Sequence, residues 1–205
     1  MRITGGKFGG RTIVTPKDAR VRPTADKVRQ AIFNILSHND FGGGFSLDGA
    51  RVTDLFAGTG AMGIEALSHG ALFCLFVDDS AESRALIRAN VEALGLTGDT
   101  KIWRRDATDL GAMSPGAGGP FDLAFLDPPY RQNLIDPALR ALREGGWLAS
   151  GALIVAELAE DESAPVATGL VHLDERIYGD TRVVLLRSAI SLSANPANPP
   201  ITSFP

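Results

Sequence analysis

In the stretch FDLAFLDPPY, an apolar run is followed by four residues that could do chemistry, Asp127-Pro128-Pro129-Tyr130. Two consecutive prolines remove two backbone donors and fix φ near about −65°, so the chain leaves the run in a stiff turn. A rigid carboxylate and an aromatic ring then stand at the end of a predicted strand, where open α/β sheets bind ligands. Because Asp and Pro are also common turn residues, the tetrapeptide alone fits either a capped turn or an active site.

A glycine-rich segment, Asp54-Leu-Phe-Ala-Gly58-Thr-Gly60-Ala-Met-Gly63, follows another predicted strand and opens a predicted helix. Such glycines permit a sharp turn against a ligand, and the helix N-terminus offers unpaired N–H groups. The spacing matches GxGxxG, which is a weak signal when it stands alone. Asp78, 20 residues beyond Gly58, is placed to bind ribose hydroxyls. These features predict an adenosine cofactor and leave NAD and S-adenosylmethionine as alternatives.

Further acids around the predicted site favour one of these cofactors. Asp54 precedes the glycines, where a carboxylate could orient an amino-acid moiety, and Asp106 ends the third predicted strand, where it could accept a hydrogen bond from an adenine amine. Each acid alone could be a helix cap. Together with Asp127, they suit a cationic sulfonium better than an anionic diphosphate, which favours S-adenosylmethionine.

The elements that must position these residues alternate between strand and helix, which predicts βαβ units, a parallel sheet and helices on both of its faces. At the end of the chain, a Gly179-Asp180 turn predicts an antiparallel hairpin that closes the sheet. The predicted strands cover residues 50–56, 71–78, 100–106, 121–127, 151–158, 170–179 and 181–188, and the predicted helices cover 61–69, 80–94 and 134–143.

The N-terminal part is basic, since residues 1–30 hold eight Lys or Arg and two acids, a balance of +6 within a chain of net charge −4. Glycine pairs predict a small hairpin there. The apolar spacing then predicts an amphipathic helix with Thr24 as its N-cap and with Lys27 and Arg29 off the apolar face. We divide the chain into a basic extension (1–45), a cofactor-binding domain (46–188) and a disordered tail (189–205). The extension is predicted to meet a polyanion, the alternative being a solvated arm.

Composition restricts the remaining classes of function. No apolar run reaches the roughly 18 residues of a membrane span, and the first residues lack the apolar region of a signal peptide, so we expect a cytoplasmic protein. The single cysteine, Cys74, lies in an apolar run and is predicted to be a core residue. The three histidines have no ligand spacing, so no metal site is predicted.

Four segments resemble one known family: GGKFGGRTI, RPTADKVRQAIFNIL, DLFAGTGAMGIEALSHGA and FDLAFLDPPY. They are similar to the RsmD family, whose members use S-adenosylmethionine to methylate N2 of one guanine in bacterial small-subunit ribosomal RNA. The likeness runs from about Arg2 to Arg187 and implies a class I methyltransferase, with a Rossmann-like, seven-stranded, mostly parallel sheet. The chain departs from the family's Val-Glu-x-Asp at Val77-Asp78-Asp79-Ser80, so Ser80 receives no binding role.

The resemblance also implies roles for particular residues, with S-adenosylhomocysteine as the product and no metal. Asp127 and the carbonyl of Pro128 would hold the target amine, Tyr130 would stack on the flipped base, and the RPT segment would help to close the pocket. The predicted cofactor-binding residues are Arg22, Pro23, Thr24, Asp54, Phe56, Ala57, Gly58, Gly60, Asp78, Asp106, Ala107 and Asp127. The predicted RNA-binding residues are Lys7, Arg11, Lys17, Arg20, Arg22 and Arg131.

We expect a monomer that acts on ribosomal RNA in an assembling small subunit, without a membrane contact. Three alternatives to this reading remain besides NAD binding. An adenine-N6 DNA methyltransferase shares DPPY but would need a target-recognition domain, for which no insertion is long enough. A protein-glutamine methyltransferase usually carries Asn in place of Asp127. A non-catalytic RNA-binding assembly factor could keep the cofactor pocket.

Overall fold

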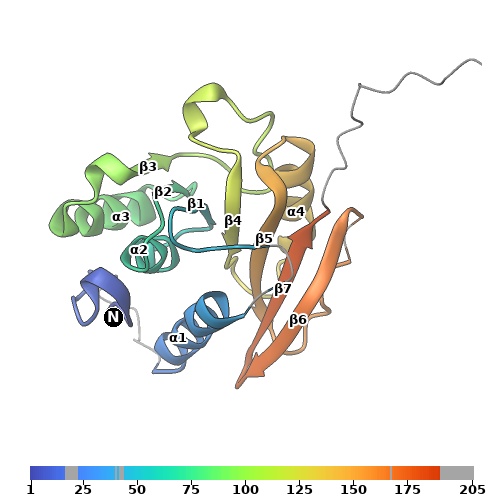
Figure 1. Cartoon of the computed structure of the whole chain (residues 1–205), viewed down its shortest axis with the longest axis horizontal. Coiled ribbons are helices and arrows are strands. Elements are labelled where there is room, and N and C mark those ends of the chain that lie inside the picture. The colour runs from blue at the N-terminus through green and yellow to red at the C-terminus, as the bar shows by residue number, and fades with distance from the viewer. Residues whose placement is uncertain (17–22, 40, 42–43, 167, 190–205) are drawn as a thin grey trace, which may run out of the picture.

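One seven-stranded sheet, in the order β3-β2-β1-β4-β5-β7-β6, forms the centre of the protein (Figure 1). The computed structural model describes residues 1–16, 23–39, 41, 44–166 and 168–189. The strands are β1 (Arg51–Leu55), β2 (Phe73–Val77), β3 (Thr100–Trp103), β4 (Phe121–Leu126), β5 (Leu148–Ala159), β6 (Leu170–Tyr178) and β7 (Thr181–Ser188). The helices are α1 (Pro23–His38), α2 (Ala61–Ser68), α3 (Ala81–Leu94) and α4 (Ile135–Glu144).

The first five strands pair in parallel, and β7 pairs antiparallel with both β5 and β6. The predicted mostly parallel sheet with a C-terminal hairpin is therefore confirmed. β7 lies between β5 and β6, so β6 forms an edge of the sheet. The strand order reverses between β1 and β4, and ligands of open α/β sheets bind at the carboxyl ends of the strands at such a point.

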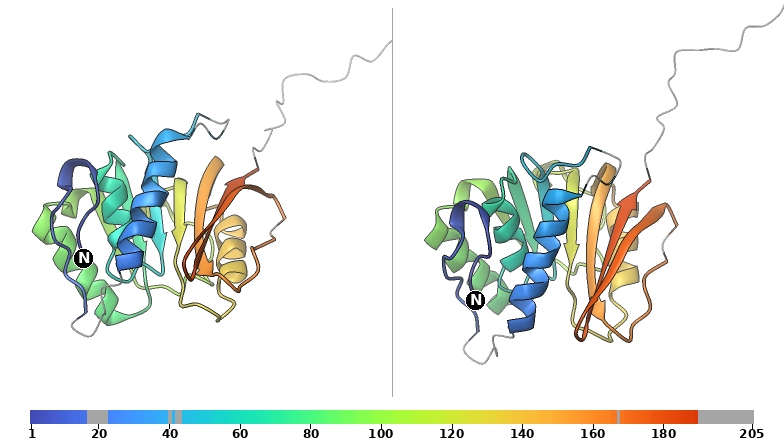
Figure 2. Two further views of the ribbon diagram at one scale, coloured as in Figure 1. Left: turned by 90° about the horizontal axis from the view of Figure 1, so that it is seen from below. Right: turned by 60° about the horizontal axis from the view of Figure 1, so that its bottom comes forward.

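Helices cover both faces of the sheet, as predicted (Figure 2). The helices α1, α2 and α3 bury Ile32, Ile64 and Ile87 in a single cluster with the sheet. The helix α4 buries Leu139 and Leu142 in a second cluster on the opposite face. Cys74 is fully buried in the first cluster, which confirms its prediction as a core residue.

Two strand boundaries differ from the prediction by three residues, and the others by two or fewer. The strand β3 ends at Trp103, whereas the prediction extended it to Asp106. Trp103 pairs with Val77, the last residue of β2, and β3 is an edge strand, so the chain beyond it has no strand to pair with. Asp106 consequently lies in a turn rather than at the end of the strand. The strand β5 begins at Leu148, before the predicted start at Gly151.

The N-terminal segment forms a short antiparallel ribbon around a 3₁₀ turn (Gly6–Phe8). Ile3 N–H donates to the Arg11 carbonyl at 3.0 Å, and Ile13 N–H donates to the Met1 carbonyl at 3.0 Å. Ile3 and Ile13 are buried in the same cluster as α1, α2 and α3. The ribbon packs against the helices α2 and α3, where Phe8 N–H donates to Ser68 Oγ and Val14 N–H donates to Asn90 Oδ1 (Figure 2).

The helix α1 begins at Pro23, so Thr24 lies in its first turn and the prediction of Thr24 as the N-cap is wrong. Pro is favoured at the first helical position because its missing N–H would have no partner there. The prediction that Arg29 lies off the apolar face is also wrong, since Arg29 is 3 % exposed. It donates to Glu65 Oε2 at 3.0 Å and to Asp26 Oδ1 at 2.9 Å, and these carboxylates compensate its burial.

Some predictions fall outside the described residues. They are the RNA contacts of Lys17, Arg20 and Arg22, the cofactor contact of Arg22, and the disordered tail beyond Ala189. Within the described ranges, no helix is both long enough and apolar enough to cross a membrane.

Candidate active site

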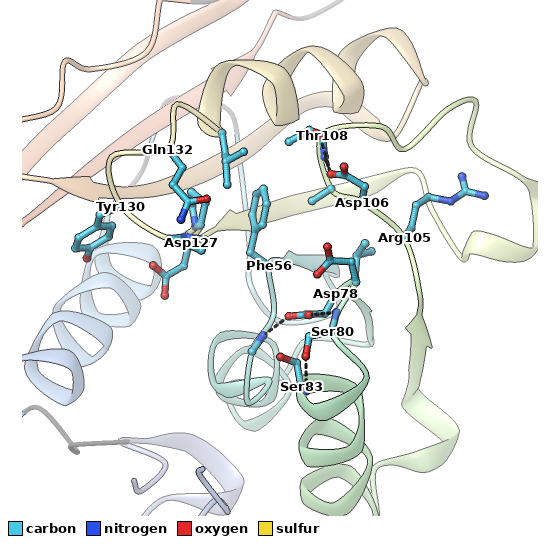
Figure 3. Close-up of a pocket in the computed structure, with 17 residues that line it drawn as sticks. Phe56, Asp78, Ser80, Ser83, Arg105, Asp106, Thr108, Asp127, Tyr130 and Gln132 are labelled. Atoms are coloured by element: carbon cyan, nitrogen blue, oxygen red, sulfur yellow. Dashed lines mark hydrogen bonds between the residues drawn. The ribbon is translucent and has the colours of Figure 1, made fainter. Parts of the chain in front are cut away.

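The carboxyl ends of β1, β2, β3 and β4 surround a cavity of about 710 Å³ (Figure 3). Small-molecule sites commonly have volumes of about 300–1,000 Å³. The cavity is lined by Phe56 and Gly58 after β1, Asp78 after β2, Asp106 after β3 and Asp127 after β4. The structure thus brings together predicted residues that lie up to 74 positions apart in the chain, counted from Phe56 to Tyr130.

The loop between β1 and α2 adopts an unusual backbone conformation. Phe56, Gly58 and Gly60 all have positive φ, at 58°, 56° and 78°. A side chain on Gly63 would collide with β2, because an added Cβ would lie 2.5 Å from the sulfur of Cys74. The glycines therefore permit both the turn at the cavity and the close packing of α2 on β2.

Asp78 is held rigidly at the edge of the cavity. It is 9 % exposed, and its two carboxylate oxygens accept from different backbone groups. Gly58 N–H donates to Oδ2 at 2.8 Å, and Ser80 N–H donates to Oδ1 at 2.9 Å (Figure 3). The Ser80 hydroxyl in turn accepts from Ser83 N–H at 3.3 Å and caps α3. Ser80 therefore has a structural role in place of the family carboxylate.

Asp106 and Ala107 lie in the turn after β3 and line the far end of the cavity (Figure 3). Asp106 Oδ1 accepts from the backbone N–H of Thr108 at 2.8 Å and from its hydroxyl at 2.7 Å. These bonds fix the turn at the cavity wall. The contact of Asp106 with an adenine amine stays a prediction.

Asp54 lies beneath the glycine loop and does not line the cavity. It is 2 % exposed, and its Oδ2 accepts from Gly63 N–H at 2.9 Å. Burial raises the pKa of Asp54 well above its usual range, against the effect of the Gly63 hydrogen bond. In this position Asp54 supports the start of α2. Its predicted cofactor contact, like those of Ala57 and Gly60, is not tested by the structure.

The DPPY segment forms the other end of the cavity, where Asp127 and Tyr130 lie together (Figure 3). Asp127 is open to the cavity, but the protein around it desolvates the carboxyl and raises its pKa to about 6. Pro128 is buried. The Tyr130 hydroxyl lies 3.1 Å from the hydroxyl of Thr181, the first residue of β7. The hairpin at the end of the chain therefore supports the ring of Tyr130.

The turn after Tyr130 directs a further side chain into the cavity. Arg131 and Asn133 have positive φ, at 61° and 55°, which is uncommon for residues other than glycine. Gln132, between them, lines the cavity (Figure 3). Arg131 N–H donates to Glu162 Oε1 at 3.0 Å, and the guanidinium pairs with Asp161 at 3.1 Å. The RNA contact of Arg131 stays a prediction and would compete with this ion pair.

Two other predicted RNA-binding residues are exposed on the N-terminal ribbon. The Lys7 ammonium lies 5.2 Å from the centre of the Phe8 ring. Arg11 Nη2 donates to the Ala93 carbonyl at 3.2 Å, which ties the ribbon to the end of α3. Their contacts with RNA are not tested by the structure.

The residues that line the cavity fit an adenosine cofactor with a cationic group. Asp78 presents a fixed carboxylate that suits the ribose diol. Val77 and Ala107 add apolar wall, while Asp106 and Asp127 place acids at its two ends. The fold and the site together define a class I methyltransferase.

Comparisons with known proteins identify the family. The family model described as conserved hypothetical protein 95 matches residues 1–187. YlbH of Bacillus subtilis is 35% identical over 189 residues, covering 91% of this chain and 98% of YlbH. Ribosomal RNA small subunit methyltransferase D of Escherichia coli is 34% identical over 166 residues, covering 80% of this chain and 78% of the relative. The protein belongs to this RsmD family of S-adenosylmethionine-dependent methyltransferases.

A solved structure agrees with this assignment. The Escherichia coli protein yhhF superimposes with a TM-score of 0.76 at 26% identity, covering 92% of this chain and 98% of that chain. The family membership resolves the alternative between NAD and S-adenosylmethionine that the glycine motif left open.

Sequence reasoning missed several residues that line the cavity. No motif pointed to Gln132 or Leu134, because they lie in an irregular turn whose direction depends on packing against the segment after β5. Ser83 lies in the first turn of α3. Because this helix was predicted, the position of Ser83 at the cavity could have been inferred. The missed residues are Val77, Asp79, Ser80, Ser83, Arg105, Thr108, Gln132 and Leu134.

Replacement of Asp78 should weaken cofactor binding. Asp78→Asn replaces the charged acceptor of the expected ribose hydrogen bonds by a neutral amide. Hydrogen bonds to charged groups contribute about 1.5–3 kcal/mol each, so we expect the Kd for S-adenosylhomocysteine to rise at least about tenfold. Isothermal titration calorimetry measures this change. Asp79→Asn is the matched control, since Asp79 is an exposed neighbouring acid of the same cavity. If only the control weakened binding, the assignment of the ribose to Asp78 would be wrong.

Proposed function

We propose that the protein methylates the exocyclic N2 amine of a guanine in small-subunit ribosomal RNA. The observation that carries the proposal is the position of the DPPY segment, at one end of a cavity whose other strand-end acids suit S-adenosylmethionine. The printed name of the Escherichia coli relative, ribosomal RNA small subunit methyltransferase D, supports ribosomal RNA as the substrate.

Bound S-adenosylmethionine supplies an electrophilic methyl group. The lone pair of a guanine N2 is delocalised into the ring, so the amine is a poor nucleophile. Asp127 and the carbonyl of Pro128 accept hydrogen bonds from the amine and direct its lone pair toward the methyl carbon. As the N–C bond forms, the S–C bonding pair remains on sulfur, and the proton lost from nitrogen moves to a carboxylate oxygen of Asp127. Positioning of this kind contributes up to about 7–11 kcal/mol in well-oriented systems.

The target base must leave its stack to reach Asp127, as in other enzymes that act on bases. Tyr130 offers a ring on which the displaced base can stack, and the hydrogen bond to Thr181 fixes that ring. The basic N-terminal residues bind RNA phosphates, a contribution that depends on salt and is largely independent of base identity.

Incubation with labelled S-adenosylmethionine tests the proposal. Small ribosomal subunits from cells that lack this enzyme, and naked RNA from them, are offered separately, and the modified base is mapped. We expect label on N2 of one guanine. Label on adenine N6 would favour the adenine alternative, and label on protein would favour a protein methyltransferase. Binding of RNA without any label would favour an assembly factor.

Tyr130 gives a more specific test of base stacking. Stacking of a base on an aromatic side chain contributes about 1–3 kcal/mol by alanine substitution, so Tyr130→Ala should raise the KM for RNA about 5- to 150-fold. Tyr130→Phe keeps the ring and should remain close to wild type, apart from the loss of the hydrogen bond to Thr181. Steady-state kinetics with RNA as the varied substrate separates the two variants. Equal losses in both would show that the hydroxyl, and not stacking, is what matters.

A further inference from the structure

Glu157 lies beside the DPPY segment in the tertiary structure, although 30 positions separate it from Asp127 in the chain. The strands β4 and β5 are parallel, with Leu126 paired to Ala156. The next residues along the two chains are therefore Asp127 and Glu157. Because neighbouring strands are about 4.8 Å apart, the register places these two acids side by side at the carboxyl edge of the sheet.

The direction of the Glu157 side chain follows from the alternation along β5. Val155 packs in the cluster on the face of α1, α2 and α3, and Ala156 packs in the cluster on the opposite face. Glu157 consequently points to the face of the sheet that α1, α2 and α3 cover, as Asp54 does in β1. Glu157 is half-buried. It also lines a smaller cavity, together with Pro128, Pro129 and Tyr130.

The charges around Glu157 disfavour a second negative charge at this place. Asp127 and Asp54 repel an ionised Glu157, while Arg29 from α1 attracts it. Arg29 is already hydrogen-bonded to the carboxylates of Glu65 and Asp26. Two neighbouring carboxyl groups ionise one after the other, because the first charge opposes the second.

We propose that Glu157 and Asp127 form a carboxyl pair that shares one proton, with Glu157 as a positioning residue for methyl transfer. The catalytic role of the pair rests on the proposed function, whereas the titration that tests the existence of the pair does not. With one proton shared, the pair has a net charge of −1. When it receives the proton lost from the amine nitrogen, the pair becomes neutral. The proton then returns to water through the open cavity, and no positive charge accumulates beside the substrate.

The pKa values have the direction that such a pair requires. Desolvation by the surrounding protein raises the pKa of Asp127 to about 6, although its side chain is open to the cavity. Burial and then the charge of Asp127 raise the pKa of Glu157 well above its usual range, although Arg29 lowers it. Because each charge opposes the other, the two carboxyls lose their protons in separate steps, and between those steps the pair holds one proton. Below about pH 6 Asp127 is protonated and can no longer accept a proton from the amine, so methyl transfer should decline toward acid pH.

Carboxyl titration by ¹³C NMR tests the pair on the full chain, without cofactor or RNA. Asp and Glu are labelled at their side-chain carboxyl carbons, and Asp127 and Glu157 are assigned by their loss in Asp127→Asn and Glu157→Gln. In the wild type we expect both resonances to respond in two steps, one of them near pH 6. In Glu157→Gln, Asp127 should lose the second step. Glu160→Gln, an exposed acid on the chain beyond β5, is the control and should keep both steps.

The reciprocal variant keeps the inference testable if Glu157→Gln does not fold. In Asp127→Asn, the pKa of Glu157 should move down toward its ordinary range, because a repelling charge has been removed. An unchanged titration of the remaining carboxyl in either folded variant would overturn the pair. The proposed function fails separately, through the absence of labelled RNA. If Glu157→Gln loses the second titration step while the wild type does not methylate RNA, the pair exists and the assigned reaction is wrong.

Discussion

Asp127→Ala should lower kcat for methyl transfer by about 10²- to 10⁴-fold, the contribution usual for a positioned proton acceptor. The carboxyl lies at the end of the cavity, and its pKa of about 6 leaves it mostly ionised at neutral pH. Alanine removes both the hydrogen-bond acceptor for the amine and the group that receives its proton. Single-turnover rates with saturating RNA and cofactor measure the loss, and calorimetry with S-adenosylhomocysteine shows whether cofactor binding also changes.

Asp127→Asn separates the two tasks of the carboxyl. The amide oxygen still accepts a hydrogen bond from the amine but does not take its proton at neutral pH. A rate within about tenfold of the wild type would show that Asp127 mainly orients the amine. A loss as large as that of Asp127→Ala would show that proton transfer dominates. Asp109→Ala, an exposed acid outside this cavity, is the control, and wild-type rates in Asp127→Ala would contradict the assigned site.

Glu65→Ala should have the largest effect on stability. Glu65 is fully buried in α2 and accepts from the backbone N–H groups of Thr4 and Gly5, at 2.9 and 2.8 Å, and from Arg29 Nε at 3.0 Å. Removal of one partner of a buried ion pair typically costs about 3–5 kcal/mol, because the other charge remains without compensation. We expect a decrease of that size in the free energy of unfolding, measured by urea denaturation.

Two further variants show whether the buried charge is the cause. Glu92→Ala, at an exposed position of α3, should change stability by less than about 0.5 kcal/mol. The double replacement of Arg29 and Glu65 by Ala should cost less than the sum of the single replacements, because the uncompensated charge is gone. Additive effects would mean that the contacts of Glu65 with the ribbon, and not its pair with Arg29, account for the loss.

The fold class follows from local patterns in the sequence. Alternation of apolar strands with amphipathic helices requires βαβ units, and the Gly179-Asp180 turn requires a hairpin, because both are local consequences of periodicity and turn chemistry. The motifs also indicated Gly58, Asp78 and Asp127, since glycines, acids and prolines have few reasons to occur together at strand ends. These residues line one cavity in the structure.

Which charged residues face the site and which support the fold depends on tertiary packing. Arg29 belongs to a basic segment in the sequence, yet it is buried against Glu65, a partner 36 positions away. Asp54 stands in a cofactor motif, yet its carboxylate holds the start of α2. Glu157 belongs to no motif, and only the register of β4 and β5 places it beside Asp127. Such contacts depend on long-range pairing and helix packing, which no local pattern of residues specifies.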